Sequence, residues 1–92
     1  MLVRFYHDDT GQPHIFSHGV DEDEAVDVLE RPIEDRAGRD GARVAIGQTR
    51  NGRYLRVVYV RDPVPGSIFC ITALDLTLKE LKALRRRRRR KS

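Results

Sequence analysis

The histidine at position 18 is a candidate for acid–base chemistry. An imidazole gains and loses a proton near neutral pH, so it can act as a general base or acid. Metal-free cleavage of RNA needs such a group for the 2′-hydroxyl proton, together with cations that stabilise the phosphoryl oxygens. His18 precedes Gly19 and a predicted helix. Its imidazole is therefore either a catalytic group or a hydrogen-bond partner for the start of that helix.

A second candidate site lies in the predicted strand "YLRVVYVR". Alternation along a strand places Tyr54 and Arg56 on one face and Tyr59 on the other. An arginine beside an aromatic ring suits RNA, because it pairs with phosphate while the ring stacks on a base. The alternative is a solvated sheet face with ordinary cross-strand pairs. Tyr59 is either a core residue or a functional hydroxyl.

The third candidate is the cationic run near the C-terminal end, Arg85, Arg86, Arg87, Arg88, Arg89, Arg90 and Lys91. The run carries +7, whereas the whole chain carries +4, so the other residues together carry −3. Blocks of like charge are commonly interaction segments. This one can bind RNA phosphates, dock an acidic partner, or remain a solvated end. Phosphate contacts would supply affinity without reading the base sequence.

Composition argues against several other classes of protein. The 92 residues suit one domain, and the single Cys70 supports neither a disulfide framework nor a zinc site. His14 and His18 are four residues apart, but no third ligand accompanies them, so we predict no metal and no cofactor. No apolar run is long enough to cross a membrane, and no signal peptide is evident. We therefore expect a cytoplasmic protein without a membrane partner, and the sequence leaves its oligomeric state open.

Local signals predict the elements that would position these side chains. Asp21 and Glu24 form a capping box at the start of a helix that Pro32 ends, and Asn51-Gly52 is a hairpin turn. Thr77 and Glu80 cap a second helix, which we expect to fray within the arginine run because like charges repel at i,i+4. The strands are predicted at Leu2–His7, Arg43–Thr49, Tyr54–Arg61 and Ser67–Leu74, and Glu34–Gly41 is predicted to be a polar loop.

These elements predict an α+β fold with the order β-α-β-β-β-α. The strands would form a small antiparallel sheet with both helices packed on one face. Residues 1–84 would make a single α+β domain, and residues 85–92 a basic C-terminal helix extension or tail.

Three segments in this order resemble a known family: "HGVDEDEAVDVLERP", "AIGQTRNGRYLRVVYV" and "IFCITALDLTLKELKALRRR". They are similar to the BrnT-type toxins of bacterial toxin–antitoxin systems and to the neighbouring uncharacterised domain family DUF4258, both of which have a RelE/ParE-like fold. The resemblance extends over about residues 13–90. It implies a RelE/ParE-like arrangement of the predicted elements.

The resemblance also implies an activity and a partner. Similarity to BrnT-type toxins implies a ribosome-independent endoribonuclease, which would be metal-independent here if active, and a partner antitoxin with a ribbon-helix-helix domain. His18 matches the histidine of their "K-H-G-[VI]" pattern. Arg53 matches the arginine of "G-R-x-L-x-V-x-Y" and Tyr59 closes that pattern, so the resemblance makes these three the candidate catalytic residues. The chain has Leu74 where the toxins usually carry arginine, and it has no Trp. A second interpretation is therefore a non-catalytic module of this fold that binds RNA or a partner.

Overall fold

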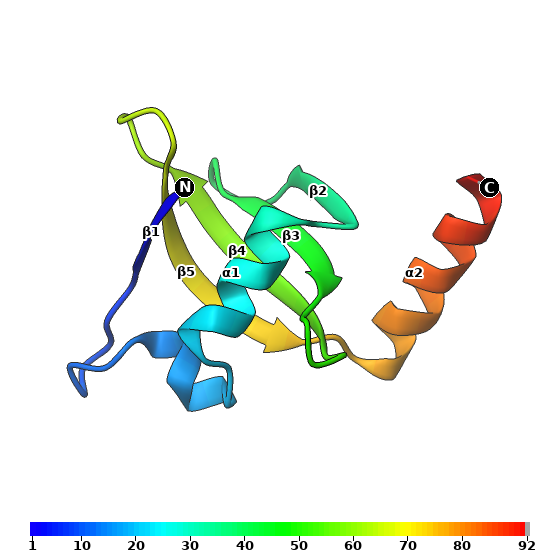
Figure 1. Cartoon of the computed structure of the whole chain (residues 1–92), viewed down its shortest axis with the longest axis horizontal. Helices are drawn as coiled ribbons and strands as arrows, with labels where there is room; N and C mark the ends of the chain where they lie inside the picture. The colour runs from blue at the N-terminus through cyan, green and yellow to red at the C-terminus, as the bar shows by residue number, and fades with distance from the viewer. Residues whose placement is uncertain (92) are drawn as a thin grey trace.

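The structure is a computed structural model that describes residues 1–91. Within these residues the chain forms five strands, a short 3₁₀ helix and two α-helices (Figure 1). In chain order the elements are β1 (Leu2–Phe5), η1 (His14–His18), α1 (Glu22–Glu30), β2 (Glu34–Ala37), β3 (Arg43–Gln48), β4 (Tyr54–Arg61), β5 (Ser67–Asp75) and α2 (Leu78–Lys91). The predicted α+β class is confirmed.

Both helices begin at the predicted capping boxes. Asp21 accepts a hydrogen bond from the Glu24 backbone N–H, and the Glu24 carboxylate accepts one from the Asp21 N–H in return. Thr77 and Glu80 make the same pair of bonds at the start of α2, at 3.0 and 3.1 Å. Gly52 has φ +90° in the β3–β4 turn, a conformation that glycine adopts without strain. Each of these starts and turns depends on residues close together in sequence.

The sheet is mixed, so the prediction of an antiparallel sheet is wrong at one edge. Its strand order is β1-β5-β4-β3-β2, and β1 runs parallel to β5 with Leu2 opposite Ser67 and Phe5 opposite Cys70. The other neighbouring strands pair antiparallel. Val3 and Phe5 pack against the core from this edge. The burial of these two side chains is the physical reason that β1 joins the sheet beside β5.

The segment predicted as a polar loop contains an edge strand. β2 pairs antiparallel with β3, which corrects the predicted order to β-α-β-β-β-β-α. Its carboxylates have partners, since Asp35 accepts hydrogen bonds from Tyr59 and from Arg43. Charged residues are common on edge strands because they discourage pairing with other chains. The polar composition that suggested a loop is therefore compatible with a strand here.

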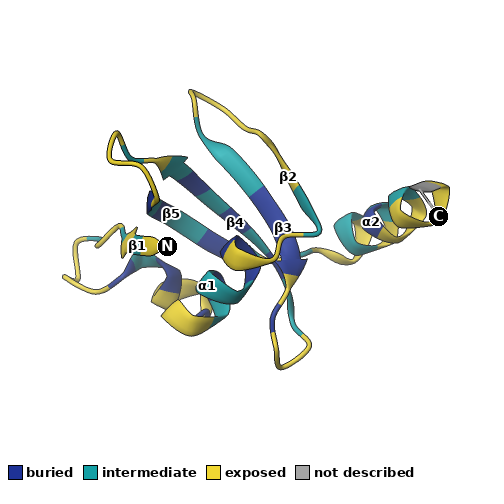
Figure 2. Cartoon of the chain, turned by 45° about the horizontal axis from the view of Figure 1, so that its top comes forward, coloured by how far each residue is buried: buried dark blue, intermediate teal, exposed yellow. Residues whose placement is uncertain are grey.

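One face of the sheet carries the main hydrophobic core, under α1. Ala25, Val28 and Leu29 of α1 are buried with Leu55 and Val57 of β4. Figure 2 shows these buried segments where α1 crosses the central strands. A Cβ atom at Gly47 of β3 would lie 3.3 Å from Val28 Cγ1. Glycine there lets α1 approach the sheet closely.

Helix α2 belongs to the opposite face of the sheet, which corrects the prediction that both helices share one face. Glu34, Ile46, Arg56 and Leu74 are direct cross-strand partners and so share a face, and none of them belongs to the core under α1. Two of these residues, Glu34 and Arg56, form ion pairs with α2. Figure 1 shows α2 at one end of the molecule's long axis.

The arginine run is part of α2. The helix continues through Lys91, so the predicted fraying within residues 85–91 is wrong, and Ser92 lies outside the described residues. An ion pair from the middle of the run to the sheet, described below, opposes the like-charge repulsion. Neither α-helix within residues 1–91 has the length and apolar character that crossing a membrane requires.

Candidate nucleic-acid interface

One side of α2 anchors the helix to the sheet. Leu84 is fully buried, and the Arg87 guanidinium donates two hydrogen bonds to the Glu34 carboxylate, at 2.7 and 2.9 Å. Glu80 lies one turn before Leu84, and its carboxylate is 3.7 Å from the Arg56 guanidinium. The bond to Glu34 raises the pKa of Arg87 above its ordinary value. Arg87, predicted as a nucleic-acid contact, therefore has a structural partner.

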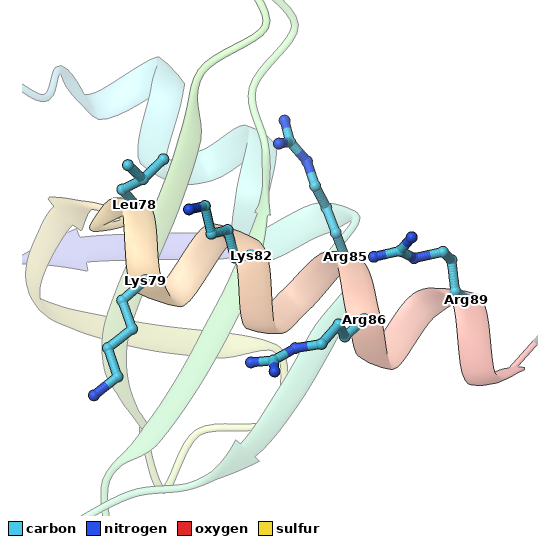
Figure 3. Close-up of a pocket in the computed structure, with 6 residues that line it drawn as sticks. All are labelled: Leu78, Lys79, Lys82, Arg85, Arg86 and Arg89. Carbon is cyan, nitrogen blue, oxygen red and sulfur yellow. The ribbon is translucent and has the colours of Figure 1, made fainter.

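The other side of α2 is cationic and open. A step of two residues turns a helix by about 200°, so Lys82 and Arg86 lie nearly opposite Leu84. A shallow depression of about 680 Å³ runs along this outer face (Figure 3), lined by Leu78, Lys79, Lys82, Arg85, Arg86 and Arg89. Apart from Leu78, every lining residue carries a positive charge. We call this surface the outer face of α2.

Charge is concentrated on this helix. Residues 78–91 include nine cations and one acid, a net charge of +8, so the remaining residues carry −4 of the total of +4. Within the described side chains, Lys79, Lys82, Arg85 and Arg86 have no carboxylate within 4.0 Å. The one acid of α2, Glu80, faces Arg56 on the sheet. The outer face can therefore attract polyanions without competition from its own helix.

Tyr54 and Arg56 lie on the same sheet face, as alternation predicted, but Arg56 is not open to solvent throughout. Its side chain is 37% exposed and its Nη1 atom faces Glu80. Its Nε atom is buried without a hydrogen-bond partner. Tyr54 is half-buried next to it on β4. Because Arg56 is already paired with α2, these two residues are a weaker candidate for contact with nucleic acid than the outer face.

His18 is the last residue of η1 and is exposed. Its ring packs edge-on against the ring of His14, with 5.1 Å between ring centroids. The His14 Nδ1 atom is 3.3 Å from the carboxylate of Asp8. The Asp8 carboxylate therefore lies beside the pair of imidazole rings. In the described part of the chain, no three side chains of the metal-binding types gather into a group that could hold an ion.

Arg53 immediately precedes β4 and joins three parts of the chain. Its Nε and Nη2 atoms donate to the Asp75 carboxylate at 2.7 and 2.9 Å. Its Nη1 atom donates to the Gly19 carbonyl at 2.7 Å and to Glu24 at 2.9 Å. The hydrogen bond to Asp75, above all, raises the pKa of Arg53. Four of the five N–H donors of this guanidinium are thus committed within the fold.

Tyr59 is a core residue, one of the two alternatives that the sequence left open. It is 2% exposed, and its hydroxyl donates to the Asp35 carboxylate on β2. Burial, reinforced by Asp35, raises the pKa of this hydroxyl. Cys70 is also buried, which raises the pKa of its thiol to about 12. Neither group is available to a macromolecular substrate.

The three candidate catalytic residues do not converge on one site. His18 adjoins Gly19, to which Arg53 is bonded, so these two lie near each other. Tyr59 is six residues farther along β4 than Arg53, which corresponds to about 20 Å. The geometry therefore separates the cationic outer face of α2 from the predicted cleavage residues.

Sequence reasoning missed Leu78, Lys79 and Lys82 as members of the outer face. The signal was present in the helical period, because Leu78, Lys82, Arg85 and Arg89 recur at steps of four, three and four residues. The sequence prediction took the seven consecutive cations of residues 85–91 as the contact surface, whereas the surface consists of residues on one side of the helix.

Comparisons of the chain with models of protein families, with characterised proteins and with solved structures each found no match.

Proposed function

We propose that this protein is an RNA-binding module that holds single-stranded RNA by its phosphates on the outer face of α2. The observation that carries the proposal is the division of α2 into two sides. Leu84 and Arg87 fix one side to the domain, while Lys79, Lys82, Arg85 and Arg86 stand on the other without carboxylate partners. Because the folded domain already holds the backbone of α2 in place, binding does not have to order this helix.

Binding of this kind would be strongly dependent on salt and indifferent to base sequence. Four phosphate contacts on a single strand correspond to a slope of about −3 for the logarithm of affinity against the logarithm of salt concentration. The guanidinium of Arg53 is hydrogen-bonded within the fold and the Tyr59 side chain is buried. These two features argue that the protein binds RNA and that the predicted catalytic residues do not cleave it. This corresponds to the non-catalytic interpretation of the toxin resemblance.

The experiment compares two variants of equal net charge. Lys82→Ala/Arg85→Ala removes two cations from the outer face, and Arg31→Ala/Arg39→Ala removes two exposed cations elsewhere. Fluorescence anisotropy with a labelled single-stranded RNA at about 50 mM salt should show at least tenfold weaker binding for the first variant and little change for the second. Equal loss in both would mean that net charge, and not this surface, drives binding.

Cleavage is tested on the same material. Labelled RNA should remain intact after long incubation with the purified protein at several pH values. Accumulation of fragments that depends on His18 would instead support the toxin-like endoribonuclease. In that case the partner implied by the resemblance, an antitoxin of the ribbon-helix-helix type, should relieve growth arrest when the two are expressed together in the cytoplasm.

A further inference from the structure

We infer that the outer face of α2 also fits the major groove of duplex DNA. This inference rests on the proposed function, because it assigns phosphate binding to the same cations. It adds a second ligand class, which is recognised by the shape of its groove. The helix would enter the groove with its anchored side turned away from the DNA.

The dimensions of the two partners agree. An α-helix with its side chains is about 10–12 Å across. The major groove of B-form DNA is about 12 Å wide and 8.5 Å deep, so it admits one helix. The major groove of duplex RNA is deep and narrow, and its minor groove is shallow. An exposed α-helix therefore distinguishes duplex DNA from duplex RNA by the width of the major groove.

The fold presents α2 in the way that groove entry requires. Thr77 and Glu80 cap its start, and Leu84 and Arg87 hold one side against the domain. The fourteen residues of α2 extend about 21 Å along the helix axis. Figure 1 shows α2 at one end of the long axis, with α1 and η1 away from it. Helix α2 is therefore held at one end of the molecule, away from α1 and η1.

Cations flank both sides of the outer face. Lys79 and Arg86 leave one side of the helix, and Lys82 and Arg85 leave the other (Figure 3). In a groove, Lys79 and Arg85, which lie farthest from the centre of this face on its two sides, would point towards the two phosphate backbones that form its walls, and Lys82 and Arg86 would point towards its floor. No carboxylate of α2 faces outward, because Glu80 faces Arg56. The surface lacks the Asn and Gln side chains that read adenine, so any contact with base edges would come from its arginines and lysines and would favour guanine.

The test uses four labelled nucleic acids of one sequence and the full-length protein. They are a single-stranded RNA, a duplex RNA, a duplex DNA and the same duplex DNA with glucosylated hydroxymethylcytosines, whose sugars fill the major groove and leave the phosphates unchanged. Anisotropy titrations at about 50 mM salt give the four affinities. Duplex DNA should bind at least as tightly as the single-stranded RNA and about tenfold more tightly than duplex RNA or glucosylated DNA.

Variants and outcomes separate the two proposals. Lys82→Ala/Arg85→Ala should weaken duplex DNA binding at least tenfold, whereas Arg31→Ala/Arg39→Ala should not, and circular dichroism should show that both remain folded. Equal affinity for plain and glucosylated DNA, or for duplex DNA and duplex RNA, would overturn groove entry and leave RNA binding intact. Binding of duplex DNA without single-stranded RNA would overturn the proposed function alone. Absence of binding to all four would overturn both.

Discussion

Replacement of Arg53 by Met separates a structural role from a catalytic one. The guanidinium bonds to Asp75, Glu24 and the Gly19 carbonyl, and its side chain is 25% exposed. Methionine keeps much of the apolar stem and removes every hydrogen bond. If the role of Arg53 is structural, the variant should lose stability whether or not RNA is present.

The size of the loss follows from the exposure of each partner. Asp75 is 58% exposed, so its ion pair contributes about 0.5 kcal/mol. Glu24 is 12% exposed, and the Gly19 carbonyl accepts its hydrogen bond at 2.7 Å. The loss of these two hydrogen bonds together should cost roughly 2.5 kcal/mol. The free energy of unfolding should therefore fall by about 3 kcal/mol, which lowers the melting temperature of a domain this small by roughly 12–24 °C.

Urea denaturation followed by circular dichroism measures this change. The matched control is Arg50→Met. The Arg50 side chain is 72% exposed, and its ion pair with Asp27 is a single contact of 3.4 Å. The control should change the free energy of unfolding by less than about 0.5 kcal/mol. An Arg53→Met protein as stable as wild type, but with altered RNA binding or cleavage, would refute the structural role and return Arg53 to the functional site.

Three further predictions concern the acids, the helix anchor and the core tyrosine. Hydrogen bonds from Arg53 lower the pKa of Asp75. Burial alone would raise the pKa of Glu24, but hydrogen bonds from Asp21, Asn51 and Arg53 outweigh burial, so this pKa is also lowered. Their stabilisation is present above the ordinary pKa values of 3.8 and 4.5 and is lost as the pH falls below them, so the urea midpoint should drop between about pH 5 and pH 3, and less steeply in Arg53→Met. Leu84→Ala should cost about 2–3 kcal/mol and remove amide-exchange protection from α2 before the sheet. Tyr59→Phe should lower the free energy of unfolding, measured by urea denaturation, by about 1 kcal/mol and leave the RNA dissociation constant unchanged.

The parts of the fold that sequence predicts well are those determined by neighbouring residues. The capping boxes at Asp21 and Thr77 and the turn at Gly52 involve groups within a few positions of one another. The pairing of β1 with β5 joins residues about 65 positions apart, and no local pattern specifies it. The edge strand β2 was missed because the partners of its acids, such as Arg43 and Arg87, come from other elements.

The candidate site shows the same limit. Arg53 reads in sequence as an exposed cation at the start of a strand, yet its partners lie 22, 29 and 34 residues away. The outer face of α2, in contrast, depends on the helical period alone and could have been derived from it. What the sequence could not supply was the orientation of α2, which the bond between Arg87 and Glu34 determines.

The salt dependence of RNA binding tests the central claim most directly. Affinity for one single-stranded RNA is measured from about 50 to 300 mM salt for wild type, for Lys82→Ala/Arg85→Ala and for Arg31→Ala/Arg39→Ala. The slope should be about −3 for wild type and for the second variant, and about −1.4 for the first, because the first has lost two phosphate contacts. Equal slopes for all three proteins would contradict the assignment of RNA binding to the outer face of α2.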